Sequence, residues 1–130
     1  MNAVELLLKM DKGKVKAIPT KQVEVKRLSG IAGEPFIVTL KAISSDKIEE
    51  ISEMFGESSK ADGDRYLVYS AWDMTKDERE RFREAQKEYG AATPTELIGA
   101  IFTAGEVASL AKTIAVLSGI GVDTIEEVKN

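Results

Sequence analysis

Few residues of this chain could do chemistry, because neither histidine nor cysteine occurs among its 130 residues. This composition excludes nucleophiles activated by histidine and zinc sites built from cysteine or histidine. Carboxylates remain, and Asp62 and Asp64 flank Gly63 in a stretch rich in turn-forming residues. Two carboxylates in a loop could bind a divalent cation, but the cation needs several more oxygen ligands and no loop of suitable spacing follows. We therefore interpret Asp62-Gly63-Asp64 as a solvated turn.

Two other patterns allow both a functional and a structural interpretation. Glu49, Glu50 and Glu53 could act as acid–base groups, but their spacing is typical of the solvated face of a helix. Residues 29–33 contain two glycines, as a phosphate-binding loop would, but no Lys-Ser/Thr pair follows and no helix is expected after them. We interpret this stretch as the connection of a β-hairpin.

Trp72 is the residue best suited to stack on a ligand, together with Tyr66 and Tyr69. Their helical spacing within an apolar segment favours packing in a core instead. A small carboxylate-using enzyme or ligand-binding domain would need a closed pocket around Asp62, Asp64 or Trp72. We predict that the chain is not an enzyme and has no catalytic, cofactor-binding or metal-binding residues.

Composition limits the partners. The chain has 18 basic and 22 acidic residues, a net charge of −4, and its basic clusters are interrupted by acidic or apolar residues. Nucleic acid is therefore not expected as a partner, since phosphate binding needs a concentrated basic surface. No apolar stretch approaches the roughly 20 residues that a membrane span needs, and Glu5 interrupts the apolar run near the start. The absence of cysteine fits a reducing compartment, so we expect a cytoplasmic protein without a membrane partner.

The first third of the chain is predicted to contain a short helix and a hairpin. Asn2 is placed to cap a helix over residues 2–10, with Glu5 three residues on. From residue 15 to residue 43 the pattern changes to alternation typical of β-strands. The alternating apolar residues are Val23 and Val25, then Phe36, Val38 and Leu40. We predict an antiparallel hairpin whose second strand turns Phe36, Val38 and Leu40 inward.

The rest of the chain is predicted to be helical. A helix over residues 44–56 is followed by a polar loop over residues 57–64 and by an apolar central helix over residues 65–74, for which a strand is the alternative. Phe82, Ala85 and Tyr89 are the apolar anchors expected for a charged surface helix after residue 75. Four Thr-x-x-Glu patterns predict helix starts. They begin at Thr75, Thr93, Thr103 and Thr124.

Together these elements predict an α+β fold. An N-terminal antiparallel β-hairpin or small sheet packs against a C-terminal multi-helix layer. Residues 1–130 are expected to form a single domain, with a short helix and a β-rich part over residues 1–43 and a helical part over residues 44–130.

Residues 89–119 carry a specific resemblance. The sequence Tyr-Gly-Ala-Ala-Thr-Pro-Thr-Glu at residues 89–96, Ala-Gly-Glu-Val-Ala at 104–108 and Leu-Ser-Gly at 117–119, with a short acidic tail at 126–130, resembles the XkdN-like tail assembly chaperones of tailed phages and prophages. The β-rich first half followed by helices is similar in pattern. The chain departs from the family pattern at residues 72–76, where a polar loop containing Asn and Pro is expected.

The resemblance implies a non-enzymatic factor in virion morphogenesis. Such chaperones bind the long, helical tape measure protein and keep it soluble while tail tube subunits polymerise around it, and they are absent from the finished tail. The resemblance thus implies the tape measure protein as partner and the bacterial cytoplasm as location, with the tail tube protein and a second copy of the chain as further candidate partners. A structural tail component retained in the virion, such as a tube or completion protein, is the alternative.

Two terminal apolar runs are the candidate partner-binding residues. Leu6, Leu7 and Leu8 are adjacent in a short helix, so they cannot all face one core. The C-terminal run is too short to form a stable helix by itself, so it is either docked on the core or a mobile arm for the client or for a neighbouring copy. Its apolar residues are Ile120, Val122, Ile125 and Val128.

Overall fold

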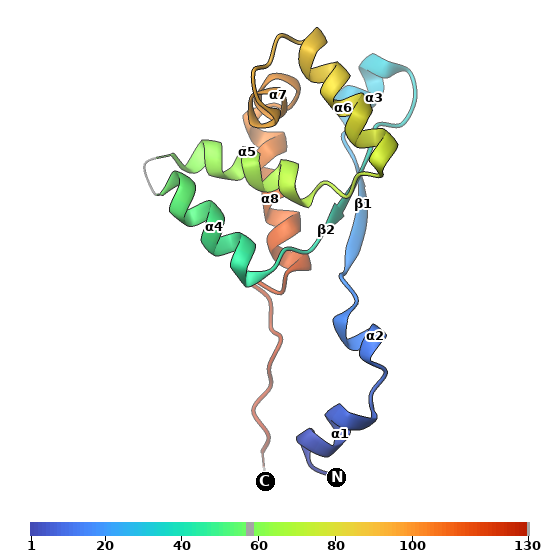
Figure 1. The fold of residues 1–130 in the computed structure, drawn as a ribbon, viewed down its shortest axis with the longest axis vertical. Coiled ribbons are helices and arrows are strands. Elements are labelled where there is room, and N and C mark those ends of the chain that lie inside the picture. The colour runs from blue at the N-terminus through green and yellow to red at the C-terminus, as the bar shows by residue number, and fades with distance from the viewer. Residues whose placement is uncertain (57–58, 130) are drawn as a thin grey trace.

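The computed structural model describes residues 1–56 and 59–129, which form eight helices and two strands. In chain order these are α1 (Ala3–Lys9), α2 (Lys12–Lys16), β1 (Thr20–Glu24), α3 (Lys26–Ala32), β2 (Ile37–Lys41), α4 (Ser45–Phe55), α5 (Lys60–Ala71), α6 (Lys76–Glu88), α7 (Pro94–Ile101) and α8 (Ala104–Leu117). Residues 20–119 form a body of helices around a short sheet (Figure 1). Residues 1–19, the N-terminal arm, and residues 120–129, the C-terminal arm, project from the same end of the body.

The sheet has two antiparallel strands, as predicted. In the register of β1 with β2, Val23 lies opposite Val38 and Lys21 opposite Leu40. Val38 and Leu40 are fully buried on one face of the sheet. Ile37, which directly precedes Val38, is exposed on the other face. This alternation arises because successive side chains of a strand point to opposite faces of the sheet. The predicted α+β fold, with the small sheet packed against a helical layer, is confirmed.

The connection between the strands is not a simple hairpin loop, and that prediction was wrong. Helix α3 occupies most of it and ends at Gly33, whose φ of 76° is the left-handed conformation in which glycine ends helices. The hydroxyl of Ser29 then accepts a hydrogen bond of 2.8 Å from the N–H of Phe36. Glycine stops helices as readily as it makes turns, so Gly33 was misread as a turn.

The β-pattern also does not begin at residue 15. Residues from Lys12 to Lys16 form α2, because the side chain of Asp11 accepts hydrogen bonds from the N–H groups of Gly13 and Lys14. The strand begins only at Thr20, where the chain meets its partner β2.

Helix α5 begins earlier and ends earlier than predicted. The predicted polar loop is wrong for residues 60–64, which are helical, while residues 57–58 lie outside the described part of the chain. Gly63 is buried within α5, where it faces Ile51 and Phe55 of α4. The helix ends at Ala71 because the chain then joins the sheet: Trp72 bridges to Leu40, and the N–H of Asp73 donates to the carbonyl of Thr39 at 2.8 Å.

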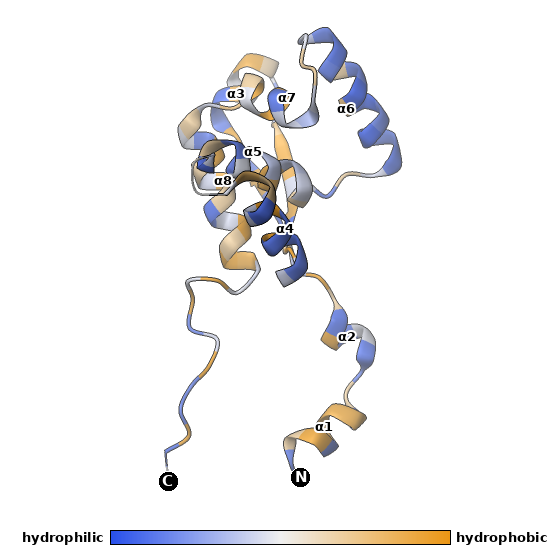
Figure 2. Ribbon diagram, turned by 60° about the vertical axis from the view of Figure 1, so that its left-hand side comes forward, coloured by the Kyte–Doolittle hydropathy of each residue, from blue (hydrophilic) through white to orange (hydrophobic). Residues whose placement is uncertain are grey.

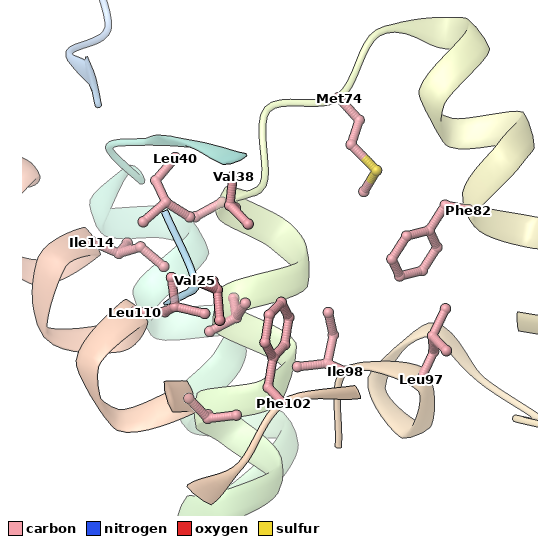
Figure 3. Packing of buried hydrophobic residues seen from close by; sticks show 13 residues of the cluster. Val25, Val38, Leu40, Met74, Phe82, Leu97, Ile98, Phe102, Leu110 and Ile114 are labelled. Carbon is pink, nitrogen blue, oxygen red and sulfur yellow. The ribbon is translucent and has the colours of Figure 1, made fainter. Parts of the chain in front are cut away.

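The core lies between the sheet and the central helix α5, which contacts α4, α7 and α8 (Figure 3). Its fully buried large side chains are Leu40, Leu97, Ile98, Ile114, Val38 and Val68. Four aromatic rings meet edge-on or tilted beside it, with centroids 5.8–6.5 Å apart. They belong to Phe36, Trp72, Phe82 and Phe102.

Three of the four predicted Thr-x-x-Glu helix starts are confirmed. Thr75 and Thr103 form complete capping boxes, and Thr93 caps α7 with Pro94 at the first helical position. The prediction at Thr124 was wrong, because residues 122–129 form no helix. The segment lacks a packed apolar face, and a hydroxyl cap is too small a contribution to nucleate a helix alone.

Candidate partner-binding surface

The acidic loop that could have held a metal is part of a helix. Asp62 forms an ion pair of 3.1 Å with Arg65, one turn further along α5. Over the described residues, no group of three or more acidic side chains is arranged to hold a metal ion. Of the three glutamates singled out on α4, Glu50 is paired with a neighbour: the Nζ of Lys47 lies 2.8 Å from it, and this hydrogen bond raises the pKa of Lys47.

The aromatic residues that could have stacked on a ligand pack against other rings. Trp72 makes an edge contact with Phe82 at 5.8 Å between centroids, and Tyr69 lies 5.4 Å from the same ring. Tyr66 packs on Phe55 at 5.6 Å. The helical spacing of these three residues therefore reflects packing between elements, as the sequence analysis predicted.

Helix α1 presents apolar side chains without a partner in the chain. Every residue of the N-terminal arm is exposed, and Leu8 is 73% exposed. The helix is defined locally, because the Asn2 side chain accepts a 2.8 Å hydrogen bond from the N–H of Glu5 and donates to its carboxylate. Leu6, Leu7 and Leu8 are all on this exposed arm, and the ribbon of α1 is mainly apolar (Figure 2).

The C-terminal arm is not docked on the core. Gly119, with a φ of 82°, lies in the turn that follows α8, and the chain then extends away from the body. Ile125 and Val128 are 89% and 85% exposed, and Ile120 and Val122 are exposed as well. Of the two alternatives for this segment, the structure adopts the projecting arm. The two candidate runs thus lie outside the body, on separate segments that leave the same end of it.

An ion pair joins α3 to the start of α8. Arg27 donates to both carboxylate oxygens of Glu106, from Nε at 3.0 Å and from Nη2 at 2.9 Å, and to the carbonyl of Ile101 at 2.7 Å. These hydrogen bonds, with that from the N–H of Thr103, lower the pKa of Glu106 to about 2. Because Arg27 and Glu106 bind each other and also hold the backbone at Ile101 and Thr103, we assign this pair a structural role.

A cleft along α6 was missed by the sequence analysis. It encloses about 300 Å³ between α5, α6 and the start of α7, with an apolar floor that includes Tyr69, Met74 and Phe82. Three cations line it, and they recur one helical turn apart on α6: Arg79, Arg83 and Lys87. The four-residue spacing of these cations could have indicated a common face. However, α6 carries charges of both signs around the whole helix, so only the packing shows which charged residues face a cleft. We call this site the α6 cleft.

Another cleft, of about 370 Å³, lies between α3, α6 and α7 over the aromatic rings. The predicted anchor Tyr89 lies at its edge and is 64% exposed, so it does not anchor α6 as expected. Phe82 is the buried residue of that helix.

None of the described helices is by itself long and apolar enough to cross a membrane. Helices α7 and α8 would reach that length and hydropathy only as a pair, and they are bent by 117° at their junction.

A folded body that bears exposed apolar arms has the features of a protein-binding module. The family is shown by the sequence. The profile of the phage XkdN-like tail assembly chaperone proteins matches residues 4–129, so the chain belongs to this family of phage tail assembly chaperones. No curated protein and no solved structure shows significant similarity to the chain. The resemblance found at residues 89–119 is thereby confirmed and extends over almost the whole chain.

Proposed function

We propose that this chaperone is non-enzymatic and acts by binding the tape measure protein in the cytoplasm of the bacterial host. It keeps this client soluble while the tail tube forms, and it is not retained in the finished tail. Membership of the tail assembly chaperone family supports this proposal, as does a surface that carries apolar side chains and no metal-binding cluster among its described residues.

The observation that carries the proposal is the exposure of α1. A helix of seven residues is too short to be stable in water without contacts to a partner, yet no residue of α1 is buried in the chain. Its apolar side chains leave water when they pack against an apolar stripe of another helix. A long helical client exposes such stripes, which would otherwise associate with each other. The exposed apolar residues of the C-terminal arm are a second surface available for a partner.

The net charge of the chain supports the proposal that it keeps the client soluble. A chaperone with a net charge of −4 adds negative charge to each covered segment of the client. Repulsion between copies on different client molecules then opposes their association.

The proposal is tested by co-expression of the full chain with the tape measure protein of the same phage or prophage. The measurements are the soluble fraction of the client and its co-purification with the chain. We expect both to depend on the chain, and both to fall in a variant with Leu6→Gln, Leu7→Gln and Leu8→Gln. The control is Ile31→Gln, which replaces an apolar residue on the body that is as exposed as Leu8.

Two results would contradict the proposal. One is a client that stays insoluble and forms no complex although both proteins are well expressed. The other is a stoichiometric amount of this chain in purified tails, which would identify it as a structural tail component.

A further inference from the structure

The α6 cleft is a basic and apolar site whose charges have no partner within the described chain. Arg79, Arg83 and Lys87 line it beside Tyr69 and Pro94. The ion pairs of residues 1–56 and 59–129 join Arg27, Lys47, Arg65 and Arg81 to carboxylates, and none of them involves the three cations of the cleft. Uncompensated cations gathered over an apolar floor are unusual in a chain with a net charge of −4.

The C-terminal arm has the complementary chemistry. Its apolar residues Val122, Ile125 and Val128 are separated by carboxylates, and all of them are exposed. The carboxylates are Asp123, Glu126 and Glu127. An arm of this composition can place apolar side chains on the floor of the α6 cleft and carboxylates beside its cations.

The N-terminal arm does not have this complementarity. It carries Lys9, Lys12, Lys14 and Lys16 against Glu5 and Asp11. Its excess of positive charge would be repelled by the cations of the cleft. Charge therefore selects the C-terminal arm as the occupant.

Within one copy, the C-terminal arm starts far from the α6 cleft. Helix α8 has 14 residues, so it is about 21 Å long. The arm leaves its C-terminal end, whereas α6 lies towards the opposite end (Figure 1). In the structure the arm extends away from the body, so it does not fill the α6 cleft of its own copy. The arm of a second copy can approach this cleft from outside.

We propose that the C-terminal arm of one copy docks in the α6 cleft of a second copy, through its acidic and apolar residues. Exchange of both arms gives a closed dimer, and transfer of one arm to the next copy gives an open chain of copies. In either case the N-terminal arms stay free. The inference concerns contacts between copies and does not depend on the client.

The experiment measures self-association by sedimentation velocity over a range of concentrations, with the full chain and two charge-reversal variants. The cleft variant carries Arg79→Glu and Arg83→Glu, and the arm variant carries Glu126→Lys and Glu127→Lys. We expect the full chain to associate, with an affinity that falls as salt rises from about 0.05 to about 0.5 M. Each variant alone should associate about tenfold or more weakly, because attraction is replaced by repulsion.

The decisive sample is an equimolar mixture of the two variants. In the mixture each arm meets a cleft of opposite charge, so we expect association to return. Far-UV circular dichroism of each variant checks that the body is folded, and both pairs of substitutions are at exposed positions. The proposal is overturned if the full chain is monomeric throughout, if association survives in both variants, or if the mixture stays as weakly associated as the separate variants.

Discussion

At the scale of single residues, the Arg27–Glu106 pair shows how one side chain serves two elements. Glu106 accepts from the N–H of Thr103 at 2.8 Å, which completes the capping box of α8, and it also binds the guanidinium that begins α3. The carboxylate thus satisfies a helix terminus and ties the strand connection to the last helix. Both partners remain partly exposed, so the pair contributes less than its geometry alone suggests.

Glu106→Gln isolates the charge, because glutamine can still accept the hydrogen bond of the capping box. We expect a small decrease in the urea midpoint at neutral pH. The folded pKa of about 2 lies below the ordinary value of 4.5, so the carboxylate stabilises the fold above pH 4.5 and loses this effect as pH falls towards 2. The difference between the two proteins should therefore shrink over that window. A difference that stays constant down to pH 2 would contradict this account.

Replacement of glycine by alanine should have opposite effects on stability at two positions. A Cβ on Gly63 would lie 3.7 Å from Ile51 and from Phe55, which is ordinary contact, and the position is inside a helix. Gly63→Ala should therefore stabilise the protein by about 0.5–1 kcal/mol. Gly33 has a φ of 76°, so Gly33→Ala should destabilise it by about 1 kcal/mol. Chemical denaturation measures the change in the free energy of unfolding for both variants. If the two changes have the same sign, the contact at Gly63 or the helix end at Gly33 is misassigned.

At the scale of elements, α6 is attached to the body by few buried side chains. Phe82 is its buried residue, while its other positions are charged or lie at the edges of clefts. Its start is set by the capping box of Thr75 and Glu78, which does not depend on packing. Phe82 is therefore the main anchor of α6 on the body, and both flanking clefts depend on its position.

Phe82→Ala should cost about 3 kcal/mol, since it removes a buried ring that contacts Trp72 and Tyr69. Limited proteolysis should then cut first within residues 73–93. Tyr89→Ala is the matched control on the same helix, and it should change stability by no more than about 0.5 kcal/mol because the side chain is exposed. Equal effects of the two substitutions would show that Tyr89 anchors the helix after all.

At the scale of the whole molecule, stability and binding belong to different parts of the chain. The buried side chains all lie between Val25 and Ile114, and the two arms contribute none. The N-terminal arm is joined to the body at its last residue, where the carbonyl of Pro19 accepts a hydrogen bond of 2.9 Å from the N–H of Ala42. A surface so separated can bind a partner without straining the core.

Removal of residues 1–18 should therefore leave the thermal midpoint of the body within about 3 °C of the full chain, because it deletes no buried residue. The same truncation should abolish solubilisation of the client under the proposed function. Circular dichroism and co-expression measure the two properties separately. A large fall in the midpoint would mean that the arm packs on the body and is not free to bind.

The sequence by itself determined the features that depend on neighbouring residues. Thr75, Thr93 and Thr103 cap helices through groups within three positions, and Val38 and Leu40 face inward by simple alternation. The family was also readable from contiguous motifs. These signals are local, so no knowledge of the fold is needed to interpret them.

Only the tertiary structure decided the features that depend on distant residues. Gly63 belongs to a helix because Ile51 and Phe55 lie against it, and α5 ends at Ala71 because Trp72 meets Leu40. The candidate binding residues were predicted as apolar runs, but their exposure follows from the body closing without them. The α6 cleft likewise arises where three elements meet. Long-range packing selects among local propensities, and one sequence does not show which distant residues will meet.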